Sequence, residues 1–189
     1  MNRSDFLRHT GGLACAACAA SVLGSSSANA ATAEDSSALQ GQLDQAKGEY
    51  SFTNNWLSDL FDAIETEVDR PTQERLLEAC GRGCYRRHKF KQDIAAEGAG
   101  DLDKLLAAYR KNFNIERVGD TVHIRYGGGK CFCPAAKNRP LRTNDVQCEC
   151  TKATHLMVFQ TALGRPFKGE IIESVRRGDS NCHIAIHLV

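Results

Sequence analysis

The residues most able to do chemistry in this chain are its cysteines, nine among 189 residues. Four of them form two close pairs, Cys131 with Cys133 and Cys148 with Cys150, separated by a fourteen-residue gap. If the intervening loop closes, four thiolates meet, which is the sulfur set that Zn²⁺ prefers and that iron–sulfur clusters also use. We therefore predict a zinc site at these four cysteines, with an iron–sulfur cluster or no metal as alternatives.

Disulfides are the next alternative for the same cysteines. Exported domains with paired cysteines are commonly cross-linked, and six paired cysteines allow about fifteen connectivities, so the sequence does not select one. A bridge between Cys131 and Cys133 would close a small strained ring, which favours bridges between the two pairs. Free thiols are the remaining alternative.

A third pair, Cys80 and Cys84, has the spacing of one helical turn, so both sulfurs are expected on one side of a helix. They are further candidates for the metal site, but they also continue an apolar stripe with Leu76 and Leu77. Cysteine is often buried, so core packing is the alternative role for this pair. Cys182 is predicted to be a core residue of a strand.

A cysteine-dependent hydrolase is the enzymatic alternative. Cys148 and Cys150 should lie near the start of a helix over about 151–163, where unpaired amides favour thiolates. One of them would be the nucleophile and His155, a further candidate for the site, would be the base. The sequence offers no recognisable third partner for such a pair.

Three histidines form a row on predicted strands. His183 and His187 lie two strand positions apart, on the face opposite Ile184 and Ile186, and His123 occupies the equivalent face of an earlier hairpin. Such a row could line a pocket or lie on a solvated sheet face.

The elements that must position these residues are first helical and then extended. Helical spacing predicts a helix over about 53–67, another from Pro71 that Gly81 and Gly83 weaken, and a third capped by Asp101.

The second half of the chain alternates hairpins with a helix. Alternating apolar residues predict hairpins over about 115–126 and 167–188, and the helix between them should end at Gly164. The fold class is therefore predicted as α+β, with N-terminal helices followed by an antiparallel sheet of two hairpins and an intervening helix.

The first thirty residues have the features of an export signal. Arg3 and Arg8 supply positive charge, residues 13–23 form a short apolar run, and Ala28 and Ala30 are small enough for signal peptidase. The run is shorter than the ~20 apolar residues of a membrane-spanning helix. We expect residues 1–30 to be removed on export to the periplasm or cell envelope.

Residues 2–8 resemble the twin-arginine translocation motif, with Ser4 in place of the second arginine. Behind the signal we expect a linker and weak helix over 31–50, mobile at 31–38, and one cysteine-rich domain over 51–189. Basic residues number 24 and acidic residues 23, a balance that argues against nucleic acid as a partner.

The C-terminal part of the chain resembles a known domain type. Residues 164–188, and above all the segment from Glu173 through Gly178 and Asp179 to Cys182, are similar to the end of vinyl-reductase-type domains. A related bacterial group is described as amino-thiazoline-carboxylate hydrolase-like. The paired cysteines resemble those of uncharacterised members of that neighbourhood, and the resemblance covers about 76–189. It implies a small α+β module whose pocket, between sheet and helices, binds a small organic molecule.

The sequence therefore predicts an exported small-molecule-binding domain with a structural zinc site. A cysteine-dependent hydrolase and a disulfide-linked periplasmic interaction domain are the alternatives.

Overall fold

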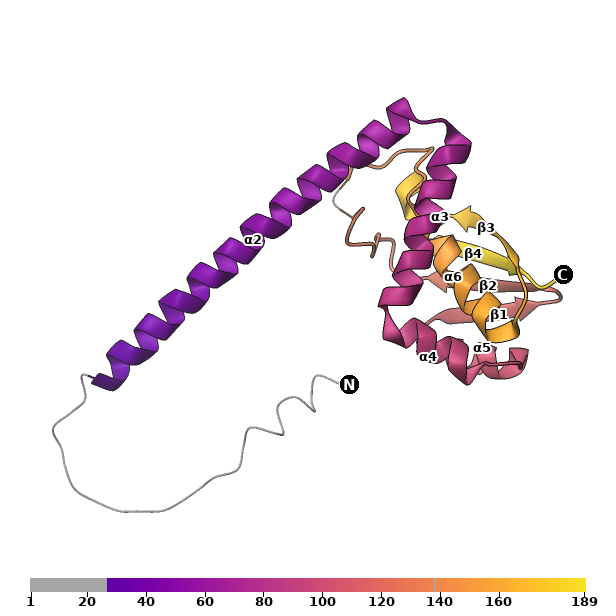
Figure 1. Ribbon diagram of the computed structural model, residues 1–189, viewed down its shortest axis with the longest axis horizontal. Helices are drawn as coiled ribbons and strands as arrows, with labels where there is room; N and C mark the ends of the chain where they lie inside the picture. Colours follow the sequence, from indigo (N-terminus) through magenta and orange to yellow (C-terminus); the bar gives the residue numbers. More distant parts are fainter. Residues whose placement is uncertain (1–26, 138) are drawn as a thin grey trace, which may run out of the picture. The chain divides into compact units, whose positions relative to one another are not determined.

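The computed structural model of this chain describes residues 27–137 and 139–189 (Figure 1). The chain divides into two compact units, one ending at Glu49 and one from Tyr50 to Val189. Most of the predicted export signal, with Cys15 and Cys18, lies outside the described residues. Among the residues that are described, no helix is long and apolar enough to cross a membrane.

Helix α2 (Ser27–Glu67) begins well before the predicted start at residue 53. The predicted linker over 31–38 lies within this helix, and its mobility stays a prediction. Side chains 35–49 are all exposed, so this part of the helix has no apolar stripe. Because the helix prediction relied on such a stripe, it missed this part of α2. Side-chain pairs one turn apart support it, such as Gln40 with Asp44 at 2.9 Å.

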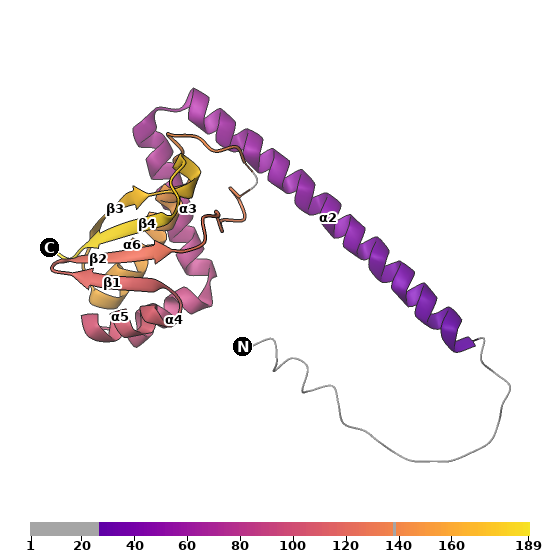
Figure 2. The same ribbon diagram turned by 180° about the vertical axis from the view of Figure 1, so that it is seen from behind.

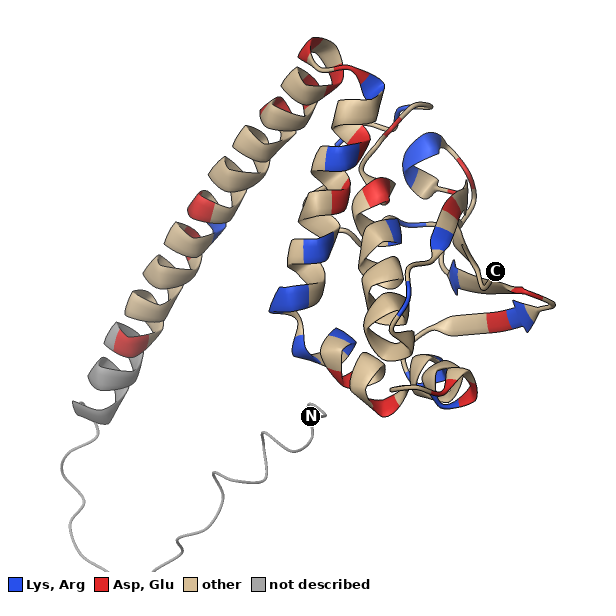
Figure 3. Cartoon of the chain, turned by 45° about the vertical axis from the view of Figure 1, so that its right-hand side comes forward, with Lys and Arg blue, Asp and Glu red and all other residues tan. Residues whose placement is uncertain are grey.

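Helix α3 (Arg70–Arg87) starts as predicted, with Pro71 in its first turn and the Asp69 carboxylate accepting a hydrogen bond from the Thr72 amide at 3.1 Å. It does not weaken at Gly81 and Gly83 but continues through both. Figure 3 shows acidic and basic residues interspersed along this helix.

Two short helices follow. The sequence did not predict helix α4 (Lys89–Glu97), but it did predict helix α5 (Leu102–Arg110). The predicted cap of α5 is confirmed, because the Asp101 carboxylate accepts a hydrogen bond from the Lys104 amide at 3.1 Å.

The sheet has four antiparallel strands. In chain order they are β1 (Asn114–Val118), β2 (Thr121–Tyr126), β3 (Lys168–Glu173) and β4 (Cys182–His187), and their order in the sheet is β1-β2-β4-β3. Helix α6 (Cys148–Leu163) connects the two hairpins and ends at Gly164, whose φ of +69° suits glycine. The predicted α+β class, with two hairpins and an intervening helix, is confirmed.

Helix α6 lies across one face of the sheet, and α3 runs beside it (Figures 1 and 2). The main core fills the space between the helices and this face. Its most deeply buried side chains are Leu105, Tyr109, Val122, Ile124, Phe159 and Ile186. The segment between β2 and α6 contains no helix or strand in its described residues, 127–137 and 139–147, and it brings two of the cysteines to the start of α6.

Candidate thiol site

Four cysteines surround one small pocket beside the first turn of α6. Cys131 and Cys133 come from the segment after β2, Cys148 is the first residue of α6, and Cys182 is the first residue of β4. We call these four the pocket thiols. The pocket measures about 60 Å³. Half of the other lining residues are apolar or aromatic, namely Tyr126, Phe132, Ile171 and Ile184, and half are polar or charged, namely Gln147, Thr151, Glu173 and Arg176.

The fourth predicted ligand, Cys150, does not line this pocket. Each residue of an α-helix turns about 100°, so Cys148 and Cys150 point to nearly opposite sides of α6. Cys150 packs instead against the smaller core cluster of Phe61, Leu77 and Val146. The structure thus brings together three of the four predicted cysteines and adds Cys182, which faces inward as predicted but lies at the pocket.

Gly81 of α3 lies directly against the backbone of Cys150 in α6, a packing role that the sequence did not predict. A Cβ atom at Gly81 would be 2.2 Å from the Cys150 carbonyl oxygen, so only glycine allows α3 and α6 to approach this closely. The Thr154 hydroxyl donates a hydrogen bond to the Gly81 carbonyl at 3.0 Å across the same contact. Cys80 and Cys84, on either side of this glycine, are thereby carried to the neighbourhood of Cys150.

Cys80, Cys84 and Cys150 form a second group, which we call the helix-contact thiols. Cys80 is exposed, and the other two are half-buried. Leu76 is also exposed, so our prediction that Leu76 and Cys80 share the buried face with Leu77 is wrong. The close contact at Gly81 determines which face of α3 is covered. Lys91 of α4 donates a hydrogen bond from Nζ to Cys84 Sγ at 3.1 Å.

Burial keeps several of these thiols protonated. Burial raises the pKa of Cys148 to about 12, against a lowering effect of the hydrogen bond between Cys148 Sγ and Ser174 Oγ at 3.0 Å. Burial also raises the pKa of Cys150 to about 12, and the nearby Cys84 adds to this effect. The pKa values of Cys133 and Cys182 are raised for the same main reason. A neutral thiol is a poor nucleophile, so the arrangement gives no activated cysteine at Cys148.

His155 is held between two tyrosines rather than beside a cysteine. Its Nδ1 lies 3.1 Å from the Tyr109 hydroxyl, and its Nε2 lies 2.5 Å from the Tyr126 hydroxyl. Burial lowers the pKa of His155 to about 3, so the ring is neutral. With both ring nitrogens occupied, His155 has no free nitrogen to act as a base for Cys148 or Cys150.

A buried ion pair between Arg176 and Asp145 lies beside the pocket. Arg176, which lines the pocket, donates from Nε and Nη2 to Asp145 Oδ2 at 2.9 and 2.7 Å, and both side chains are almost fully buried. Arg176 also donates to the carbonyls of Arg139 and Pro140, both at 2.6 Å. One guanidinium therefore fixes the segment that leads into α6.

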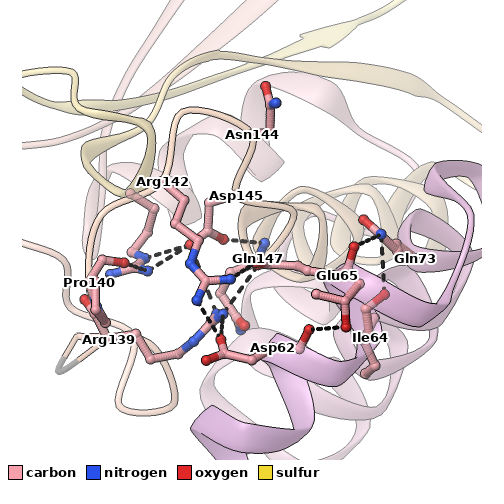
Figure 4. Close-up of polar contacts among 12 residues, drawn as sticks. Asp62, Ile64, Glu65, Gln73, Arg139, Pro140, Arg142, Asn144, Asp145 and Gln147 are labelled. Atoms are coloured by element: carbon pink, nitrogen blue, oxygen red, sulfur yellow. Dashed lines mark hydrogen bonds and ion pairs between the residues drawn. The ribbon is translucent and has the colours of Figure 1, made fainter.

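The same segment is tied to α2 by a second set of charges (Figure 4). Arg139 Nη2 lies 3.2 Å from both Asp62 and Glu65, and Arg142 pairs with the same two carboxylates. The Arg139 side chain is only 3% exposed. These charge-assisted bonds join Arg139 and Arg142 to the last turns of α2.

The predicted row of histidines lies on the other face of the sheet. His183 pairs in register with Arg125, and its Nε2 lies 2.9 Å from His123 Nδ1. The Arg125 guanidinium donates to His183 Nδ1 at 2.9 Å. These side chains do not line the thiol pocket.

The donor set fits a soft metal in kind and in number, since four thiols surround one space. Within residues 27–137 and 139–189, however, no three Cys, His, Asp or Glu side chains are close enough to hold one ion as they stand. All seven cysteines of this part of the chain are free thiols.

Comparison with known proteins adds no family. The chain matches no model of a known protein family and no curated protein. The site has therefore to be interpreted from its own geometry.

Proposed function

We propose that this protein is an exported binding domain whose four pocket thiols take up one soft metal ion, zinc in the first place, with a structural role. The observation that carries this proposal is the meeting of Cys131, Cys133, Cys148 and Cys182 around one pocket. The revised ligand set exchanges Cys150 for Cys182. Four protein sulfurs fill a tetrahedral shell, and such closed sites stabilise folds rather than catalyse reactions.

The size of the pocket favours a metal ion over an organic molecule. Sites for drug-sized ligands measure about 300–1,000 Å³, whereas this pocket measures about 60 Å³. A small organic ligand, which the family resemblance implies, would require the segment over 127–147 to move outward.

Metal binding also requires movement, because no three of the described Cys, His, Asp or Glu side chains are close enough to hold one ion as they stand. Two of the four sulfurs, those of Cys131 and Cys133, belong to a segment without regular structure, and Gly128 and Gly129 precede them with φ of +102° and +60°. The other two sulfurs belong to a helix and a strand. Closing Cys131 and Cys133 onto Cys148 and Cys182 would complete the shell, and the binding energy would contribute to folding.

The hydrolase alternative has less support. It needs a thiolate and a base, but burial keeps the Cys148 thiol protonated and His155 is neutral and engaged by two tyrosines. The disulfide alternative predicts bridges between the cysteine pairs, which mass spectrometry of envelope material without reduction would reveal.

Metal content tests the proposal directly. Full-length protein purified from cytoplasm under reducing conditions should contain about one equivalent of zinc, as four-cysteine sites do. Cys182→Ser should lose this metal, while Cys150→Ser, the matched control two residues from a ligand, should keep it. Protein without metal would overturn the proposal, and a brown protein with visible absorbance would replace zinc by an iron–sulfur cluster.

Export has a separate test. Protein recovered from the cell envelope should begin near Ala31, after removal of residues 1–30. Finding only full-length protein in the cytoplasm would overturn export while leaving the metal result unaffected.

A further inference from the structure

The corner where α3 ends and α4 begins has a high density of positive charge. Residues 82–91 include five of the chain's 24 basic residues and none of its 23 acidic residues. We call these five residues, together with Phe90, the basic corner: Arg82, Arg86, Arg87, Lys89 and Lys91. Figure 3 shows basic residues following one another along the end of α3 and into α4. The whole chain has a net charge of only +1, so this charge is a local feature.

Pairing within the protein neutralises only part of this charge. Lys89 pairs with an aspartate of α4 at 2.6 Å, and Arg82 lies 4.0 Å from a glutamate of α3. In the part of the chain that the structure describes, no carboxylate pairs with Arg86 or Arg87, and both side chains are exposed. Two guanidinium groups are therefore available to an external anion.

Helix stability also accounts for only part of the charge. The C-terminus of a helix favours cations, which explains Arg86 and Arg87 in the last turn of α3. The N-terminus of a helix disfavours cations, yet the first turn of α4 has Lys89 and Lys91, no acidic residue, and no side-chain cap from His88. Residues that break a local rule of this kind indicate a role outside the helix itself.

An exposed aromatic side chain lies among these cations. Phe90 is 45% exposed and stands between Lys89 and Lys91 in the chain. The Lys91 ammonium lies 5.6 Å from the centre of the Phe90 ring. Lysine and arginine around an exposed aromatic residue are typical of surfaces that lie on lipid headgroups.

We propose that the basic corner docks on the anionic headgroups of a phospholipid bilayer, with Arg86 and Arg87 beside the phosphates and Phe90 at headgroup depth. Charge complementarity carries this proposal, because each Lys or Arg close to an anionic bilayer strengthens binding about fivefold. A lipid surface fits better than nucleic acid, since the cations surround an apolar ring at one short corner and do not form a long basic stripe.

Vesicle sedimentation with the full-length chain tests the proposal. The protein should bind vesicles made of equal parts of phosphatidylcholine and phosphatidylglycerol more tightly than vesicles of phosphatidylcholine alone. Raising the ionic strength from about 0.05 M to about 0.5 M should release most of the difference, because salt screens surface charge. Equal binding to the two kinds of vesicle would overturn the proposal.

Two double variants assign the binding to this corner, and residues 1–30 are the same in both. Arg86→Gln with Arg87→Gln should weaken binding to the anionic vesicles about 25-fold, as expected for two cations. Arg117→Gln with Lys168→Gln is the matched control, because it removes the same charge from exposed positions on β1 and β3. The control should bind like the wild type, and equal losses in the two variants would overturn the proposal. Circular dichroism would check that both are folded.

Phe90 distinguishes a lipid surface from other anionic partners. Phe90→Ala should weaken binding to the anionic vesicles about tenfold, because the ring no longer leaves water. Trp56 is the chain's one tryptophan, so Phe90→Trp in a Trp56→Phe background reports on this position alone. Its emission should shift to shorter wavelength on the vesicles. An unshifted emission, or tighter binding to duplex DNA than to the vesicles, would overturn a lipid partner.

This inference does not depend on the metal proposal. No residue of the basic corner lines the thiol pocket. Metal content should therefore be unchanged in these variants, and the failure of one proposal leaves the other standing.

Discussion

Gly81 of α3 lies against the carbonyl oxygen of Cys150 in α6, with no space for a side chain between the two helices. A Cβ atom there would be 2.2 Å from that oxygen and 2.8 Å from the Ala153 Cβ. The contact sets the distance between the two helices, which carry four of the seven described cysteines. It therefore decides the geometry of the helix-contact thiols.

Substitution of this glycine should separate the helices. We expect Gly81→Ala to lower the free energy of unfolding by about 1–3 kcal/mol, because overpacking forces the backbone to shift. Urea denaturation followed by circular dichroism would measure the change.

Gly83→Ala is the matched control two residues away. Its Cβ would meet only the end of the flexible Arg87 side chain, at 3.0 Å. Here alanine should raise stability by up to about 1 kcal/mol, its ordinary advantage over glycine in a helix. Equal losses in the two variants would show that the Gly81 contact has no special role.

Removal of the Arg176 charge should be costly. Arg176→Met takes the closer of two arginine partners from the fully buried Asp145 and leaves it only Arg139 Nη1 at 3.9 Å, so we expect a loss of about 3–5 kcal/mol. Arg177→Met is the control, because Arg177 donates to the Asp145 carbonyl at 2.9 Å and to Glu149 at 3.3 Å, and Glu149 keeps Lys152 as a second cation, so its loss should be smaller, about 1–2 kcal/mol. A loss for Arg176→Met no larger than that of the control would contradict a supporting role for the buried pair.

His155 should make the fold sensitive to acid. Its pKa is about 3 in the folded chain against 6.5 for an ordinary histidine, so the unfolded chain binds the proton first. The stabilising effect of the neutral ring is complete above pH 6.5. It is lost as the pH falls towards 3, at up to roughly 1.4 kcal/mol per pH unit.

Urea midpoints between pH 7 and pH 5 would measure this slope. His155→Phe should be less stable at pH 7, because two tyrosine hydroxyls lose their partner, but it should show a flatter dependence on pH. A variant with the wild-type slope would assign the acid sensitivity to other groups.

The thiols should differ in their reaction with iodoacetamide. At pH 8, in reduced and metal-free protein, exposed Cys80 should react well before Cys148 and Cys150. A pKa of about 12 leaves only about one thiolate in ten thousand at that pH. In concentrated urea the three rates should converge, and peptide mapping would follow each site. Equal rates in the folded protein would contradict the protonated state.

Several elements could be predicted from the sequence because their signals are local. Asp101 has a short polar side chain at a helix start, and the strands around Gly119 and Asp120 alternate apolar and polar residues. Such features depend on neighbours within a few positions, so the sequence alone contains them.

The ligand set could not be predicted in full because it depends on helix phase and on contacts between distant segments. The helix of Cys148 begins three residues earlier than the expected position at 151, and this places Cys148 and Cys150 on a helical turn that separates them. Gly81 was interpreted as a weak point of its helix, since nothing local distinguishes a helix-breaking glycine from one that permits close packing. Cys182 follows the alternation of its strand, which does not show that the strand begins at a pocket.

The first turn of α6 gives two neighbouring thiols different surroundings. Cys148 faces the pocket, where its sulfur lies 3.0 Å from the Ser174 hydroxyl, whereas Cys150 packs against the cluster of Phe61, Leu77 and Val146. Two cysteines that are two positions apart in the chain can therefore differ in what they bind and in what reaches them.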